Sequence, residues 1–155
     1  MDVLAVKELC SRYPGASSKR YGPPSNVLVY YVGGRKFAYF KTSEPERWRF
    51  SLCTSPERFL ELTDVPGIKP ARYMARYRWV TIVEVGTVPE DYLEALIAWS
   101  YAKALAGLSA RRRSVILGAA RVVFSGPARQ ADAGTLVPLP GKQGRRRSSE
   151  SSNPW

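Results

Sequence analysis

A glycine pair, Gly33-Gly34, separates two runs of strand-forming residues, 27–32 and 36–41. Glycine accepts the positive φ angles of a tight two-residue turn without steric cost, so the two runs are predicted to pair as an antiparallel hairpin. The alternating residues from Trp48 to Cys53 predict a third strand with one mostly apolar face. The chain is therefore expected to form an antiparallel sheet around this hairpin.

Two amphipathic helices are predicted on either side of this region. Asp2 can cap a first helix, whose apolar residues share one stripe and which ends at Pro14-Gly15. Thr87 to Glu90 has the spacing of a capping box, and the apolar residues from Leu93 to Leu108 keep an i, i+3, i+4, i+7 pattern. The first helix is expected to cover the sheet.

The remaining segments give weaker signals. Residues 16–26, rich in Ser, Lys, Gly and Pro, are predicted to form a loop. Ser55 can cap a short helix through Leu62, and the β-branched run 79–85 predicts another strand. Residues 63–78 show no clear periodicity, so their secondary structure stays open.

Charge divides the chain near Ser109. Residues 1–110 hold 15 Lys and Arg against 11 Asp and Glu, a net charge of +4, whereas residues 111–155 hold 9 against 2, a net charge of +7. From Gly126 onward the sequence is too polar to offset its ordering entropy, while the apolar run 115–124 either docks on the domain or stays loose. We predict one domain, 1–109, followed by a basic, largely disordered tail, 110–155.

Composition excludes several enzyme classes. The chain has no histidine, which removes Ser-His-Asp and Cys-His mechanisms and mixed Cys/His zinc sites. Cys10 and Cys53 stand 43 positions apart, a spacing typical of neither a zinc ribbon nor a redox motif. We therefore expect no enzymatic activity, no catalytic residue, no metal and no cofactor. With no apolar run of about 20 residues and no signal-peptide pattern, a cytoplasmic location is expected.

Several short motifs occur in an order that resembles a known family. The motifs are Leu9-Cys10 with Pro14-Gly15-Ala16, Val32 to Ala38, Leu52-Cys53 with Ser55-Pro56-Glu57, Pro66 to Pro70, Trp79 with Thr81, and Pro89-Glu90 with Ser100-Tyr101. Over residues 4–108 the pattern resembles the MmcQ/YjbR family of small bacterial proteins. The resemblance implies an α+β, CyaY/frataxin-like fold, in which N-terminal and C-terminal helices pack on one face of an antiparallel sheet. It also implies a double-wing DNA-binding role.

One departure from the family pattern bears on chemistry. Members commonly carry a His before the Trp that enters the strand, whereas this chain has Arg78 before Trp79, and Val80 stands where Asn is common. Arginine keeps the positive charge but does not titrate near neutral pH. The replacement favours binding over proton transfer at this position.

The candidate site residues are cations that stand beside aromatic residues. Between Lys69 and Trp79 the sequence has four cations, three aromatics and no acid, and the predicted hairpin tip adds two more cations. Lys and Arg displace the counterions of a phosphate backbone, and aromatic rings stack on exposed bases. The predicted nucleic-acid-binding residues are Arg35, Lys36, Lys69, Arg72, Arg76, Tyr77 and Arg78. The predicted partner is double-stranded DNA, bound with low sequence specificity.

Two alternatives stay open. Trp79 can pack inward, and Tyr73 and Tyr77 can anchor their segment to the sheet instead of contacting a ligand. The chain can also be a protein-interaction module or bind a small anionic ligand, with its net charge of +11 serving solubility and steering. Neither of these two functions involves nucleic acid.

Overall fold

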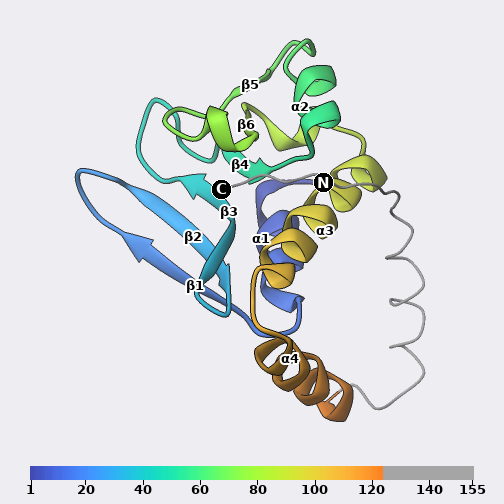
Figure 1. The fold of residues 1–155 in the computed structure, drawn as a ribbon. Helices are drawn as coiled ribbons and strands as arrows, with labels where there is room; N and C mark the ends of the chain where they lie inside the picture. The colour runs from blue at the N-terminus through green and yellow to red at the C-terminus, as the bar shows by residue number, and fades with distance from the viewer. Residues whose placement is uncertain (124–155) are drawn as a thin grey trace.

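The computed structural model describes residues 1–123, with side chains described to residue 118, and it has an α+β fold (Figure 1). Its six strands form one sheet in the order β1-β2-β3-β4-β6-β5, and each neighbouring pair is antiparallel. The strands are β1 (Ala16–Tyr21), β2 (Val27–Val32), β3 (Arg35–Lys41), β4 (Phe50–Cys53), β5 (Ile68–Pro70) and β6 (Trp79–Ile82). The helices are α1 (Val3–Arg12), α2 (Pro56–Leu62), α3 (Glu90–Ala106) and α4 (Ala110–Val123), with 3₁₀ helices η1 (Ala75–Tyr77) and η2 (Val85–Thr87).

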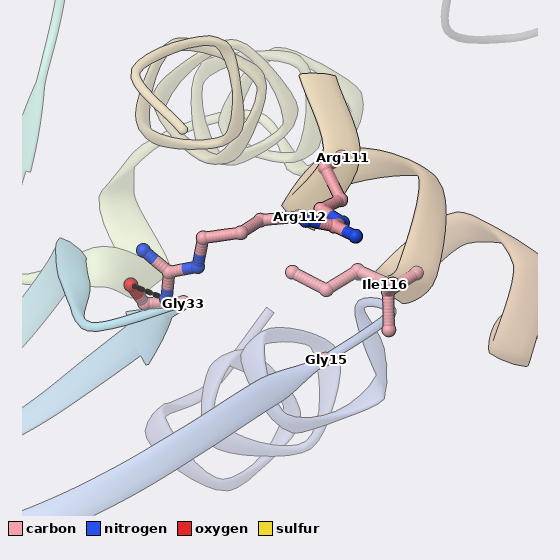
Figure 2. Close-up of a pocket in the computed structure, with 6 residues that line it drawn as sticks. Gly15, Gly33, Arg111, Arg112 and Ile116 are labelled. Atoms are coloured by element: carbon pink, nitrogen blue, oxygen red, sulfur yellow. Dashed lines mark hydrogen bonds between the residues drawn. The ribbon is translucent and has the colours of Figure 1, made fainter. Parts of the chain in front are cut away.

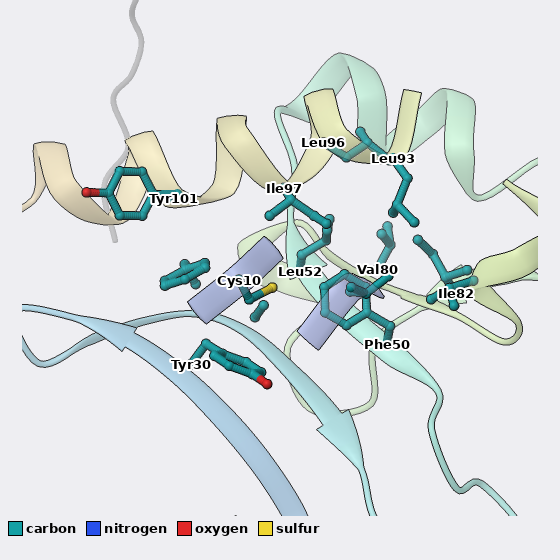
Figure 3. Packing of buried hydrophobic residues seen from close by; sticks show 14 of the residues in the cluster. Cys10, Tyr30, Phe50, Leu52, Val80, Ile82, Leu93, Leu96, Ile97 and Tyr101 are labelled. Carbon is teal, nitrogen blue, oxygen red and sulfur yellow. The ribbon is translucent and has the colours of Figure 1, made fainter. Parts of the chain in front are cut away.

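Helices α1 and α3 cover one face of the sheet and bury the main hydrophobic core against it (Figures 1 and 3). Val6 and Cys10 of α1 and Leu93 and Ile97 of α3 are fully buried. The strands contribute alternate side chains to this core, which are Tyr30, Val32, Phe40, Phe50, Leu52, Val80 and Ile82. The prediction that helices from both ends of the domain pack on one face of an antiparallel sheet is confirmed.

Local sequence signals account for the ends of several elements. The Asp2 carboxylate accepts a hydrogen bond from the Ala5 N–H at 2.9 Å and caps α1, and the Ser55 hydroxyl caps α2 in the same way at 3.2 Å. Gly33 and Gly34 form the β2–β3 turn with φ angles of 57° and 83°. The predicted hairpin and both of these helix starts are confirmed.

A β-bulge in the β2–β3 hairpin decides which side chains reach each face. The register shifts after Tyr30, so that Tyr31 pairs with Lys36. Phe37 is the extra residue of the bulge, and Phe37 and Ala38 are both fully buried in the core. The bulge thereby places Lys36 on the sheet face opposite the helices.

Three predicted local structures are wrong. Residues 16–21 form strand β1 instead of a loop, because they pair with the free edge of β2 at six register positions. The predicted strand 79–85 ends at Ile82, and the chain then enters η2. The capping box before α3 does not form, because the Thr87 hydroxyl donates to the Glu84 carbonyl at 2.8 Å and the N-cap position of α3 is Pro89.

The segment that follows Ser109 begins with helix α4. The Ser109 hydroxyl accepts a hydrogen bond from the Arg112 N–H at 3.2 Å at the start of this helix. Ile116 packs against Gly15, where an added β-carbon would lie 2.9 Å from the Ile116 side chain. Of the two alternatives left open for the run 115–124, docking on the domain is therefore found at Ile116, and the residues from Gly126 onward, for which disorder is predicted, lie outside the described residues.

Candidate nucleic-acid interface

The sheet face opposite α1 and α3, which we call the open face, carries lysines and aromatic rings. Because side chains alternate along a strand, residues in register with Tyr39 form one row on this face. The row runs Lys19, Val29, Tyr39, Ser51, Thr81 and Lys69 across all six strands. At roughly 4.8 Å per strand it spans about 24 Å. Neighbouring rows add Ser17, Tyr21, Val27, Tyr31, Lys36, Lys41, Cys53 and Trp79 to the same face.

The open face is positively charged. Its lysines are Lys19, Lys36, Lys41 and Lys69, and none of the strands in the described part of the chain contains Asp or Glu. Three of these lysines are exposed, whereas Lys41 is half-buried and donates from Nζ to the Ser25 carbonyl at 2.9 Å. Like charges on one exposed surface suit a polyanionic partner better than any small neutral one.

Two tyrosine hydroxyls add polar groups to the open face without adding negative charge. Tyr21 and Tyr31 share a hydrogen bond of 2.7 Å between their hydroxyl oxygens. This hydrogen bond and burial raise the pKa of Tyr31 to about 12, so the phenol stays neutral at pH 7. The ammonium group of Lys19 lies 5.1 Å from the centroid of the Tyr21 ring. The aromatic pair therefore helps to hold Lys19 against the sheet.

Lys36 lies beside a second aromatic pair on the open face. The Tyr39 and Trp79 rings stack with centroids 5.7 Å apart and an interplanar angle of 24°. The Lys36 ammonium lies 5.9 Å from the Tyr39 centroid and 5.8 Å from the Trp79 centroid. A cation close to two ring faces is attracted to both, so its side chain is ordered while its charge stays exposed.

The loop of residues 71–78 covers the β4–β6 end of the open face. Trp79 is 6% exposed because it packs with Cys53 and Ala71 in a second hydrophobic cluster. That cluster is also contacted by Met74 and Tyr77 of the loop and by Trp99 of α3. Trp79 thus packs inward and Tyr77 anchors the loop, which is the structural role that the sequence left open for both residues.

A buried serine of α3 joins β3 and β4 where their pairing stops. Ser100 is 1% exposed, donates from Oγ to the Phe37 carbonyl at 2.6 Å and accepts from the Cys53 N–H at 3.1 Å. Phe37 and Cys53 lie one residue beyond the last β3–β4 pair, Ala38 with Leu52. The Ser100 hydroxyl therefore bridges the backbones of β3 and β4 at the point beside the second cluster where the two strands are no longer paired with each other.

The structure separates the two cations of the hairpin tip. Lys36 lies on the open face, as does Lys69 of β5. Arg35 pairs with the core residue Val32, and its guanidinium lies on the helix side against Gly107 at the end of α3. Two adjacent residues of the predicted site therefore face opposite sides of the sheet.

The predicted arginines of residues 71–78 lie on the loop beside the open face. Arg72 pairs with Glu46 at 3.3 Å, although its side chain is 68% exposed. The Arg76 guanidinium lies 4.9 Å from the Tyr77 ring centroid and is exposed. Arg78 has a left-handed φ of 67° and donates to the Arg76 carbonyl at 3.0 Å. Of these three side chains, Arg76 and Arg72 are the more exposed.

Sequence reasoning missed several residues of the open face. These are Tyr21, Tyr31, Tyr39 and Lys41, together with Lys19, which lies in the segment 16–26 that the sequence predicts as a loop. The signal that identifies them is the alternation of Lys19 with Tyr21 and of Tyr39 with Lys41. This alternation places the residues on one face only when the register of the strands is known.

Arginines of α4 border a separate hollow of about 360 Å³ between this helix and two glycine turns (Figure 2). Gly15, Gly33, Arg111, Arg112 and Ile116 contribute to its lining. Arg112 Nη2 donates to the Gly33 carbonyl at 2.8 Å across one side of it. The hollow lies beside the α3–α4 junction and shares no residue with the open face.

No group of three or more Cys, Asp or Glu side chains within residues 1–123 could hold a metal ion together. No helix in the same residues is both long and apolar enough to cross a membrane.

Comparison with known proteins identifies the family. The YjbR family model matches residues 11–103. The crystal structure of Deinococcus radiodurans protein DR2400, described as a DUF419 domain, is similar at 28% sequence identity and a TM-score of 0.62, over 74% of this chain and 87% of that one. Among curated proteins, none matches the chain. The matched region contains β1 to β6, α2, most of α3 and the last turn of α1, and the chain belongs to the YjbR family.

Proposed function

We propose that this domain is a non-enzymatic DNA-binding module that contacts phosphates through its open face. The observation that carries the proposal is a surface with four lysines, interleaved tyrosines and no acidic residue in any described strand. Lysine is a flexible point charge that neutralises a phosphate without reading a base. We therefore expect double-stranded DNA to bind with low sequence specificity.

The buried cysteines support a binding role over covalent chemistry. Burial raises the pKa of Cys10 to about 12 and that of Cys53 to about 11, so both remain thiols near pH 7. A thiol is a poor nucleophile compared with a thiolate. Both cysteines are free, and we propose that the protein works in the reducing cytoplasm.

The salt dependence of binding tests the proposal. Fluorescence anisotropy of a labelled 20-base-pair duplex should give an affinity that falls with rising salt, with a log-log slope of about −3.6 if four lysines each neutralise one phosphate. Contacts from Arg76 or from the C-terminal residues would steepen this slope. Affinity that does not change between about 50 and 200 mM salt, or no binding at about 50 mM, would contradict the proposal.

Removal of one acid beside the open face should strengthen binding. Glu46 is 25% exposed and pairs with Arg49 at 3.7 Å and with Arg72 at 3.3 Å. Glu46→Gln should release Arg72 for one additional phosphate, raise the DNA affinity by about 3- to 8-fold at 0.1 M salt and steepen the slope by about 0.9.

Glu44→Gln is the matched control, because it changes the net charge equally while Glu44 pairs with Arg47 at 3.7 Å. The same affinity change in both variants would mean that only overall charge matters, and the placement of Arg72 would then be irrelevant to binding.

The hollow beside α4 favours a second candidate function, the binding of a small anion. Arg111 and Arg112 lie at this hollow, but Arg112 is already engaged by the Gly33 carbonyl. Saturable binding of pyrophosphate, measured by calorimetry and abolished by Arg111→Ala, would favour this candidate. Duplex binding that persists in Arg111→Ala would favour the open face.

A further inference from the structure

Among the aromatic residues that the structure describes, Tyr73 is the one that stays exposed. Its side chain is 90% exposed, whereas Tyr77 of the same loop packs against the second cluster. Exposure of a whole aromatic ring forgoes the burial that usually makes tyrosine favourable in a fold. The exposed ring therefore needs an explanation other than stability.

The backbone of the loop holds Tyr73 in this position. Tyr73 has a left-handed φ of 68°, which a non-glycine residue adopts at a cost in conformational energy. The neighbouring backbone is tied by hydrogen bonds from Met74 N–H to the Ala71 carbonyl at 3.1 Å and from Tyr77 N–H to the Met74 carbonyl at 3.0 Å. Ala71, at the base of the loop, is 1% exposed. The ring is thus displayed by a fixed loop.

The charge around Tyr73 suits a nucleic acid. Arg72 precedes it, Arg76 follows three residues later, and both of these side chains are exposed. The loop packs on Trp79, which belongs to the open face, so Tyr73 lies on a loop at the end of the surface that carries Lys36 and Lys69. Arg72 is paired with Glu46, which leaves the exposed Arg76 guanidinium to contact a phosphate that flanks a base stacked on the Tyr73 ring.

We infer that Tyr73 stacks on an unpaired base, and that the domain prefers DNA with single-stranded segments to fully paired DNA of the same charge. The inference rests on the proposed DNA-binding function and names the form of DNA that the open face holds best. Phosphate contacts by the lysines serve both forms. A base inside a duplex is already stacked between its neighbours, so a single exposed ring gains this contact only from an unpaired base.

The test compares three labelled ligands on the full chain at one salt concentration: a 16-nucleotide oligothymidine, a 16-mer of abasic sites, and a duplex of about 8 base pairs, which carries about as many phosphates as either single strand. The wild type should bind oligothymidine more tightly than this duplex. The wild type should bind oligothymidine about 5- to 150-fold more tightly than the abasic strand, the range that stacking of one base supplies. Tyr73→Ala should bind both single strands equally, and Tyr73→Phe should keep the wild-type preference. Leu60→Ala is a matched control, because Leu60 is 70% exposed on α2.

Each outcome separates this inference from the proposed function. Equal binding of oligothymidine and the abasic strand by the wild type overturns the inference and leaves phosphate binding intact; this comparison requires no variant to fold. An oligothymidine preference that survives in Tyr73→Ala also overturns it. Failure of all three ligands to bind at about 50 mM salt overturns the proposed function itself.

Discussion

Replacement of Lys19, Lys36 and Lys69 by glutamine is expected to weaken duplex DNA binding on the order of 100-fold at 0.1 M salt. Each lysine that contacts a phosphate contributes about 0.9 to the log-log salt slope, so loss of three should flatten the slope by about 2.7. All three side chains are exposed, so the melting temperature should stay within about 2 °C of wild type. Anisotropy titrations across a salt series, with thermal unfolding monitored by circular dichroism, measure both quantities.

The control for that triple variant replaces Arg145, Arg146 and Arg147 by glutamine in the full chain, which removes the same net charge. We expect this control to lose less than about 10-fold in affinity, because it leaves the open-face lysines in place. If the arginine variant loses nearly all binding and the lysine variant loses almost none, the open face is not the binding surface.

Ser100→Ala is expected to destabilise the domain by about 2–4 kcal/mol, which lowers the melting temperature by roughly 5–15 °C for a chain of this size. The Ser100 hydroxyl bonds both the Phe37 carbonyl and the Cys53 N–H at a site that is 1% exposed. Alanine leaves these two buried backbone groups without that partner, and burial of unpaired polar groups is costly.

Ser114→Ala tests whether the loss is specific to the buried bridge, because Ser114 is exposed on α4. Its melting temperature should change by no more than about 2 °C. A Ser100→Ala variant that melts as the wild type would show that the β3–β4 end does not depend on this hydroxyl.

The parts of the fold that sequence predicted correctly depend on local chemistry. The Gly33-Gly34 turn, the Asp2 cap and the Ser55 cap each involve residues within a few positions of one another. Strand β1 could not be predicted in this way, because Ser17 and Lys19 on its open face and Ser18 and Arg20 on its other face give no apolar alternation. Its pairing comes from the unpaired edge of β2.

Much of the candidate site is invisible in the sequence for a geometric reason. The sequence prediction drew most of its site residues from the closely spaced cations of residues 69–78. The open face is instead formed by every second residue of strands that are far apart in the sequence. The bulge at Phe37 adds a further reversal, since it sends Lys36 to the open face while Arg35 stays on the helix side. A shift of one residue in register moves the side chains of a strand to the other face of the sheet, and no local sequence pattern predicts this shift.

Helix α4 was equally hard to predict, because its apolar residues show no clean helical period. Val115 is 66% exposed and Leu117 is 37% exposed, while Ile116 packs against Gly15. Among the side chains that the structure describes, Ile116 and the Arg112 contact to the Gly33 carbonyl join this helix to the turns of the sheet. Such contacts depend on tertiary structure that composition does not reveal.

Lysine acetylation of the full chain, with and without saturating duplex DNA, tests most directly whether the open face binds DNA. Mass spectrometry should find Lys19, Lys36 and Lys69 acetylated several-fold more slowly in the complex. Lys7 is on α1, and its ammonium group lies 3.8 Å from the centroid of the Trp48 ring. It should be acetylated at the same rate in the free protein and in the complex. Protection confined to Lys142 or to Lys7, with the three open-face lysines unchanged, would contradict the account.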